Sequence, residues 1–250
     1  AYGFSKPGIS KQSFTAAQLV KVSSPNNRVL QLLQFSDLHG AIETGSSFGT
    51  PLLVSNFAAD RKAAATTITL SSGDNIGAAP QISSAFEEIP TIEAMNLMKV
   101  DASVFGNHEH DRNVAHLAKV IGASEFQWVT SNYSTLNGLE SGTKAAKEYT
   151  IIERGGLKIG IVGANTSQTK EQVFPGNLMT PSGKEIVIDP SMDSVNKAIK
   201  AAKAAGADFV VALVHEGWTE NLEGKAEGPL PAIAKEIQGA AIVFGAHSHL

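Results

Sequence analysis

The residues with the richest chemistry lie between positions 104 and 112, where the sequence reads Val-Phe-Gly-Asn-His-Glu-His-Asp-Arg. A short apolar run stops at Gly106. The amide of Asn107 and the imidazole of His108 follow at once, and the carboxylate of Asp111 comes three residues later. An amide oxygen can coordinate a metal ion, and a His–Asp pair can hold and transfer a proton. The stretch therefore predicts a chemically active turn after a strand.

Similar polar groups follow four other short apolar segments of the chain. Their composition is typical of buried strands, and the polar residues at their ends are Asp37 and His39, Asp74, His215, and His247 and His249. Together with His108, five of the seven histidines stand at such ends. In open α/β sheets, ligands bind outside the carboxyl ends of the strands. We therefore expect these side chains to converge on one site.

The converging side chains are oxygen and imidazole donors, and the chain has no cysteine. Such donors suit Zn, Mn, Fe, Co or Ni, whereas soft metal ions prefer sulfur ligands. The set is too large for a single ion with an open coordination position, which typically has about three protein ligands. It suits two divalent ions about 3.5–4 Å apart that share a carboxylate, an arrangement used in phosphoester hydrolysis.

The elements that must position these groups alternate along the chain. Strands are predicted at residues 28–35, 66–70, 101–105, 126–131, 186–189, 208–214 and 240–244, and helices at 51–62, 89–99, 111–121, 190–205 and 231–237. The segments 147–154 and 157–162 flank Gly155-Gly156, which predicts a β-hairpin. A sheet that contains this hairpin is not purely parallel.

The helix predicted at 111–121 has Asp111 in its first turn and Gly122 as its C-cap. His116 is then expected on the helix surface, with no assigned role. The helix predicted at 190–205 uses Asp189 as its N-cap and Pro190 as its first residue.

Composition excludes several classes of function. The 250 residues are 42% apolar and 18% charged, with a net charge of −4 and no basic patch, so nucleic acid is not an expected partner. No apolar run approaches the roughly 18 residues of a membrane span. Residues 1–27 mix Gly, Ser, Pro, Asn and Lys with little periodicity. We interpret them as a lead-in segment, of the kind that often precedes a secreted domain.

Taken in order, these motifs resemble the signature of the calcineurin-like metallophosphoesterases. They are Asp-Leu-His at 37–39, Gly-Asp at 73–74, Gly-Asn-His-Glu at 106–109, His215, and Gly-Ala-His-Ser-His at 245–249. The longer string at 106–111 resembles the Gly-Asn-His-Glu-Phe-Asp of the 5′-nucleotidase branch, with His110 in place of Phe. The resemblance spans residues 28–250. It implies an α/β fold in which two mixed sheets form a four-layer α-β-β-α sandwich, with 28–250 as the catalytic domain.

The resemblance also implies a role for each matching residue. The first metal ion would be held by Asp37, His39 and His249, the second by Asn107, His215 and His247, with Asp74 bridging the two. His108 would be the catalytic imidazole, and Asp111 would orient it and stabilise its charge. Substrate contacts are expected from Asn107, His108 and Asn132.

The sequence departs from the family pattern in three places. A Gly-Gly-x-x-Arg element often follows the first motif, but residues 48–52 read Phe-Gly-Thr-Pro-Leu, without Arg. Ala246 replaces the second Gly of the last motif and is small enough to fit. His110 is expected at the surface, with a substrate contact as the alternative. Glu216 is expected to support the site or face solvent, and Glu109 has no assigned role.

The resemblance implies hydrolysis of nucleotide phosphoesters, by a 5′-nucleotidase or a 2′,3′-cyclic-nucleotide phosphodiesterase. One alternative is a dimetal hydrolase of another ester on the same scaffold, such as a thiosulfate-ester hydrolase. Another is a non-catalytic binding module, although the complete ligand set argues against it. In 5′-nucleotidases a C-terminal nucleotide-binding domain follows, so we expect that domain of a longer protein as a partner. The expected location is periplasmic, extracellular or at the cell wall.

Overall fold

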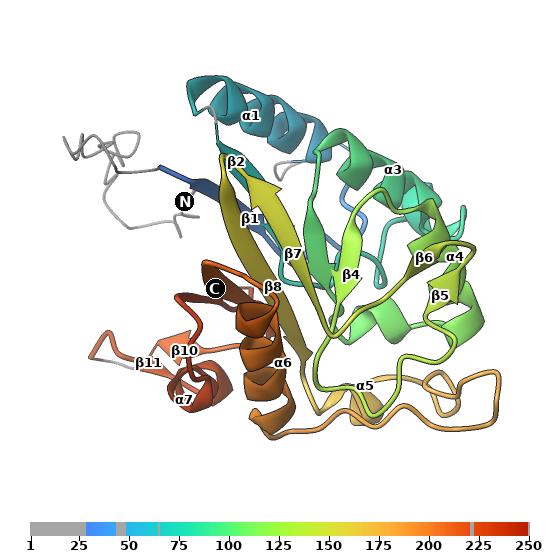
Figure 1. Cartoon of the computed structure of the whole chain (residues 1–250). Helices are drawn as coiled ribbons and strands as arrows, with labels where there is room; N and C mark the ends of the chain where they lie inside the picture. The colour runs from blue at the N-terminus through green and yellow to red at the C-terminus, as the bar shows by residue number, and fades with distance from the viewer. Residues whose placement is uncertain (1–28, 44–48, 65, 221–222, 250) are drawn as a thin grey trace.

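A computed structural model describes residues 29–43, 49–64, 66–220 and 223–249. The lead-in predicted at 1–27 lies outside these residues. Within them the chain builds two four-stranded sheets, which pack face to face between layers of helices (Figure 1). The strand orders are β1-β2-β3-β4 and β12-β9-β8-β7.

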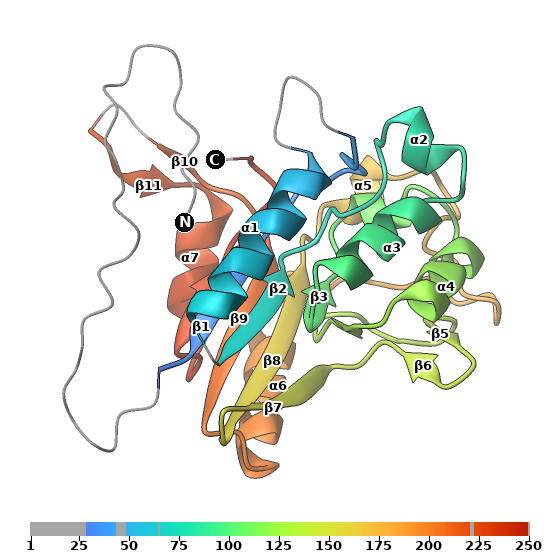
Figure 2. The ribbon, with the colours of Figure 1, turned by 90° about the horizontal axis from the view of Figure 1, so that it is seen from above.

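The first sheet is parallel throughout its four described strands. These strands are β1 (Gln31–Phe35), β2 (Thr67–Ser71), β3 (Ala102–Val104) and β4 (Gln127–Val129). The connections carry α1 (Thr50–Ala63), α2 (Gln81–Ser84), α3 (Ile89–Leu97), η1 (His108–His110) and α4 (Val114–Ala123). In Figure 2, α1 and α3 lie in front of this sheet, whereas α6 lies behind β8. Parallel strands joined by such crossovers end at the same edge of the sheet.

The second sheet has mixed strand directions. It contains β7 (Tyr149–Arg154), β8 (Leu157–Asn165), β9 (Phe209–His215) and β12 (Ile242–Phe244). β7 and β8 are antiparallel, which confirms the hairpin predicted at Gly155-Gly156, while β8, β9 and β12 run parallel. The helices α6 (Asp193–Ala204) and α7 (Pro229–Glu236) pack against this sheet. The smaller elements are β5 (Glu140–Ser141), β6 (Lys144–Ala145), α5 (Thr169–Gln172), β10 (Thr219–Glu220) and β11 (Ala226–Glu227).

β9 shows how the two sheets and their helices share one core. Its side chains alternate, so that Val211 and Leu213 pack against the first sheet while Val210 and Val214 pack in the cluster that contains α6. A strand buried on both faces reads as an unbroken apolar run. Gly163 in β8 marks a close approach of the sheets, because a Cβ there would lie 2.6 Å from a methyl group of Val104.

These layers confirm the predicted α-β-β-α sandwich. The mixed strand direction comes from β7, on the second sheet. Among the described residues, no helix is both long and apolar enough to cross a lipid bilayer.

The structure corrects the helix predicted at 111–121. The short turn η1 comes first, and α4 begins only at Val114, because Asn113 caps it by accepting a hydrogen bond from the N–H of His116. Asp111 therefore lies before the helix, and Gly122 lies inside it. The prediction that His116 is exposed was wrong, because its ring is buried and bonds the carbonyl of Glu87 at 3.0 Å.

The segment around Asp189 was also predicted incorrectly. Asp189 accepts hydrogen bonds from the N–H and hydroxyl of Ser191, so it closes a turn, and α6 begins four residues later at Asp193. Residues 186–189 form no regular strand; Ile188 makes one isolated bridge to Tyr133.

Candidate metal centre

The polar residues predicted to converge do so at the carboxyl edge of the two sheets. Their ligand atoms form three overlapping groups, and within each group these atoms lie within 4.8 Å of one another. The groups are Asp37, His39 and His249; His39, Asp74 and His108; and Asp74, His215 and His247. Because the groups share members, the atoms form one continuous cluster.

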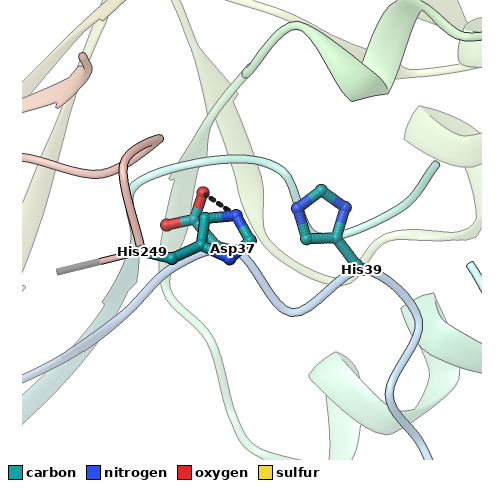
Figure 3. Close-up of side chains that lie close together, drawn as sticks. All are labelled: Asp37, His39 and His249. Carbon is teal, nitrogen blue, oxygen red and sulfur yellow. Dashed lines mark ion pairs between the residues drawn. The ribbon is translucent and has the colours of Figure 1, made fainter. Parts of the chain in front are cut away.

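The first group consists of Asp37, His39 and His249, which lie close together on the loops that follow β1 and β12 (Figure 3). Nε2 of His249 lies 3.6 Å from Oδ1 of Asp37. Nδ1 of His39 lies 3.0 Å from the carbonyl oxygen of Gly77. A carbonyl can only accept, so Nδ1 carries the hydrogen and Nε2 presents its lone pair to the site.

The group of Asp74, His215 and His247 is built around His215, which is fully buried at the end of β9. Its Nδ1 donates to the carbonyl of Ser72 at 2.8 Å. Its Nε2 faces two oxygens, Oδ2 of Asp74 at 3.0 Å and Oδ1 of Asn107 at 3.2 Å. The ring of His247 completes this group, with its centroid 5.1 Å from that of His215.

Asp74 connects the two groups. Its Oδ1 accepts a hydrogen bond from the N–H of His108 at 2.8 Å. Its Oδ2 lies 3.0 Å from Nε2 of His215 and 3.8 Å from Nε2 of His39. The carboxylate therefore lies between His39 of one group and His215 of the other.

The charges around the buried residues Asp74 and His215 favour a cation between them. Burial favours the neutral acid, yet hydrogen bonds from His215 and His108 hold the pKa of Asp74 below its usual range. Burial also works against the charged form of His215, yet the bond to Asp74 raises the pKa of His215 to about 9. A neutral His215 would direct the lone pair of Nε2 at two oxygens. Either a proton or a metal ion must therefore stand between these three atoms.

His108, which belongs to the cluster, is paired with Asp111. Nδ1 of His108 lies 3.0 Å and 2.9 Å from the two oxygens of Asp111. This hydrogen bond is the main reason that the pKa of His108 is raised, and burial opposes it. The N–H of Ala78 donates to the same carboxylate at 2.9 Å, which fixes its orientation. The pair can hold a proton close to the ligand cluster.

The backbone of the site is strained. Five of its residues adopt left-handed conformations, with φ of 52° at Asp37, 45° at His39, 51° at Asp74, 73° at His247 and 57° at His249. For residues other than glycine, this conformation costs about 1–2 kcal/mol each. Such strain persists only where the surrounding structure enforces it, and it is concentrated at functional sites.

Two glycines allow the loops of the site to meet. A Cβ on Gly106 would overlap the carboxylate of Asp74. A Cβ on Gly73, where φ is +93°, would lie 2.8 Å from Nδ1 of His215. Neither position has room for another residue, so both glycines are required for the cluster to close.

Known proteins of similar sequence include several phosphoesterases. The chain is 23% identical to the Bacillus subtilis endonuclease YhcR over 96% of its own length and 21% of that protein. It is 22% identical to the Listeria monocytogenes cell wall protein Lmo0130, over 74% of this chain and 27% of that one. It is 24% identical to the Yersinia enterocolitica 2′,3′-cyclic-nucleotide 2′-phosphodiesterase/3′-nucleotidase, over 88% of this chain and 36% of that protein. The chain thus spans well under half the length of these relatives.

A solved structure and a family model complete the comparison. The 5′-nucleotidase precursor of Thermus thermophilus superposes with a TM-score of 0.70 at 24% identity, over 88% of this chain and 42% of that one, and so shares the fold. The family model described as bacterial capsule synthesis protein PGA_cap matches residues 86–250, more than half of the chain. This chain belongs to that family, among the 5′-nucleotidase-like calcineurin-like metallophosphoesterases. The resemblance predicted from the motifs is confirmed.

Glu109 holds two loops of the site together, a role that the sequence analysis did not assign to it. The buried carboxylate accepts hydrogen bonds from the N–H groups of Asp74, Asn75 and Gly106, at 2.9, 2.8 and 2.6 Å, and from the amide of Asn75 at 3.0 Å. Burial and the charge of Asp74 raise the pKa of Glu109 to about 7, and the N–H donors oppose this rise. Glu109 fastens the loop after β2 to the loop after β3. Its position beside His108 is the only sequence signal for this role.

The expectation that His110 lies at the surface was wrong. Its ring is fully buried, packs near Phe105 and Tyr133, and bonds the Tyr133 hydroxyl through Nε2 at 2.6 Å. Burial lowers the pKa of His110 to about 4, so the ring is neutral. A contact between His110 and substrate is excluded by this burial.

Asn132 and Glu216 are the two remaining residues of the sequence-based prediction. Asn132 is buried, and its amide donates to the carbonyls of Asn165 at 2.8 Å and Asp189 at 3.0 Å. Its predicted contact with substrate stays a prediction. Glu216 follows His215 and is nearly buried, and its backbone carbonyl accepts the N–H of Ala246 at 3.0 Å. It lies outside the three ligand groups.

Proposed function

We propose that this domain is a two-metal phosphoester hydrolase that acts on nucleotides, as a 5′-nucleotidase or a 2′,3′-cyclic-nucleotide phosphodiesterase. The observation that carries the proposal is the Asp74 carboxylate, which stands between two ligand groups and next to the His108–Asp111 pair. The nucleotide substrate class is supported by relatives such as the Yersinia 2′,3′-cyclic-nucleotide 2′-phosphodiesterase/3′-nucleotidase.

The donor set fits two divalent ions. Asp37, His39 and His249 would hold one, and Asn107, His215 and His247 the other, with Asp74 shared. Oxygen and imidazole donors suit Zn, Mn, Fe, Co or Ni. When bound, such a pair supplies Lewis-acid stabilisation of phosphoryl oxygens and lowers the pKa of water.

Side chains of the protein would donate the proton and position the phosphate. The Nδ1 of His108 is held by Asp111, and the centroid of its ring lies 4.9 Å from that of His39. As an imidazolium it would bind the phosphate and protonate the leaving oxygen. Asp111 keeps that charge in place without taking the proton. Asn107 would contact both metal and phosphate.

Paired substitutions test the division between ligands and proton donor. Asp74→Ala should lose both ions, because it removes the shared oxygen. His108→Ala should retain both ions and lose most of its turnover of a generic aryl phosphate. Metal content by elemental analysis and initial rates are measured on the same samples. Equal metal loss in both variants would contradict the assignment. A fully metallated wild type without chelator-sensitive hydrolysis would indicate a binding module.

A substrate panel tests the nucleotide specificity. We expect hydrolysis of nucleoside 5′-monophosphates or 2′,3′-cyclic nucleotides to exceed that of glycerol phosphate and of a thiosulfate ester. A preference for the thiosulfate ester would favour the alternative hydrolase on this scaffold. The comparison is made on the domain and on the full-length protein, because the relatives are considerably longer.

We also propose the domain organisation and location of the full-length protein. Residues 28–250 act as the catalytic domain, and a C-terminal domain of the same protein supplies the contacts to the nucleoside. The short coverage of the relatives supports further domains, and the cell wall protein of Listeria supports a periplasmic, extracellular or cell-wall location. Fractionation of cells that express the tagged full-length protein tests the location, and recovery in the cytosol would contradict it.

A further inference from the structure

Asn165 links the two sheets next to the metal centre. It is the last residue of β8 and stands in register with His215 on β9. Its Nδ2 donates to the carbonyl of Gly106 at 3.0 Å, and Gly106 directly precedes Asn107. Asn165 therefore connects the strand beside His215 to the backbone that carries Asn107. Nε2 of His215 lies 3.2 Å from Oδ1 of Asn107; His215 ends a strand of one sheet, and Asn107 follows a strand of the other.

Tyr133 and His110 fix the orientation of that amide. Nδ2 of Asn165 also donates to the Tyr133 hydroxyl at 2.8 Å, while its Oδ1 accepts the N–H of Thr166 at 2.8 Å. The hydroxyl accepts from Asn165 and is also hydrogen-bonded to Nε2 of His110 at 2.6 Å. Turning the amide over would direct its oxygen at the Gly106 carbonyl, and the network prevents this.

The network is anchored on the first-sheet side as well. The amide of Asn177 donates to the carbonyls of His110 and Asp111, at 3.0 and 2.8 Å. His110 and Asn165 are buried, and Tyr133 is half-buried. Among the described residues, none of the three hydrogen-bonds to Asp37, His39 or His249.

We propose that His110, Tyr133 and Asn165 form a positioning network that sets the spacing between Asn107 and His215, and thereby tunes the second metal ion selectively. The inference rests on the proposed two-metal function. It assigns a role to His110, where the family pattern has Phe. Groups that orient metal ligands without touching the metal typically change affinity by about 10- to 100-fold when replaced.

The test substitution is Tyr133→Phe, which removes one hydroxyl from the middle of the network. Mn²⁺ and Zn²⁺ titrations by calorimetry, with chelator competition, give the affinity of each ion. We expect about a tenfold loss for one ion and no change for the other. Tyr149→Phe is the matched control, because it removes the hydroxyl of a half-buried tyrosine outside the network. It should change neither affinity.

Double substitutions identify which ion is affected. In a His249→Ala background, which weakens the first ion, Tyr133→Phe should still weaken the remaining ion tenfold. In a His247→Ala background, which weakens the second ion, it should have no further effect. Equal loss of both ions in Tyr133→Phe, or no loss of either, would overturn the network. A wild type that binds fewer than two ions would refute the proposed two-metal function itself, and this inference with it.

Discussion

Replacing His110 by Phe tests the burial of a neutral histidine behind the metal centre. The ring has no exposed surface, its Nε2 is bonded to Tyr133, and its Nδ1 has no partner among the described residues. Burial disfavours the imidazolium and lowers the pKa of His110 to about 4 from 6.5. Phe fills a similar volume beside Phe105 and cannot titrate. The difference between the two chains therefore isolates the proton equilibrium of this one ring.

The sign of the effect follows from where the proton binds. As the pH falls from 6.5 to 4, His110 is protonated in the unfolded chain but not in the native one. Wild-type stability therefore falls relative to His110→Phe across this window and is fully present above it. A shift from 6.5 to about 4 corresponds to about 2.5 kcal/mol between pH 7 and pH 4.5. For a domain of this size, that is about 5–10 °C in melting temperature.

Urea unfolding at pH 7, 6, 5 and 4.5 measures the effect, in chelator so that metal binding does not contribute. The variant also loses the hydrogen bond to Tyr133, which shifts its stability by an amount independent of pH. The slope of the difference against pH is therefore the readout. A difference that stays constant within about 0.5 kcal/mol from pH 7 to 4.5 would refute a buried neutral ring, because an exposed histidine titrates alike in both states.

Two further substitutions test the other groups around the site. Glu109→Gln places an amide against two N–H donors whichever way it turns, so it should lower stability by about 2–6 kcal/mol, measured by thermal unfolding. The control Glu87→Gln removes an exposed carboxylate paired with Lys119 and should leave the melting temperature unchanged; equal losses would refute the special role of Glu109. Asp111→Asn removes the main cause of the raised pKa of His108, so the alkaline limb of the kcat/KM profile should move to lower pH. An unmoved limb would show that His108 is not the proton donor.

The sequence by itself determined the location and chemistry of the site. Asp37, Asp74 and His215 each follow a short apolar run, and parallel strands end at one edge of a sheet, so their convergence could be predicted. The residue types fixed oxygen and imidazole donors. The hairpin at Gly155-Gly156 was also predictable, because its turn depends on adjacent residues alone.

The structure decided the features that depend on distant partners. Asp111 lies outside α4 because Asn113 caps that helix, a choice between neighbouring polar residues that periodicity does not make. The buried ring of His110 is hydrogen-bonded to the hydroxyl of Tyr133. The carboxylate of Glu109 joins two loops because it accepts a hydrogen bond from the backbone of Asp74. Burial and hydrogen bonds to distant residues are properties of the packed fold. The local sequence around a histidine or glutamate in a turn therefore does not distinguish a residue that faces solvent from one that holds the site together.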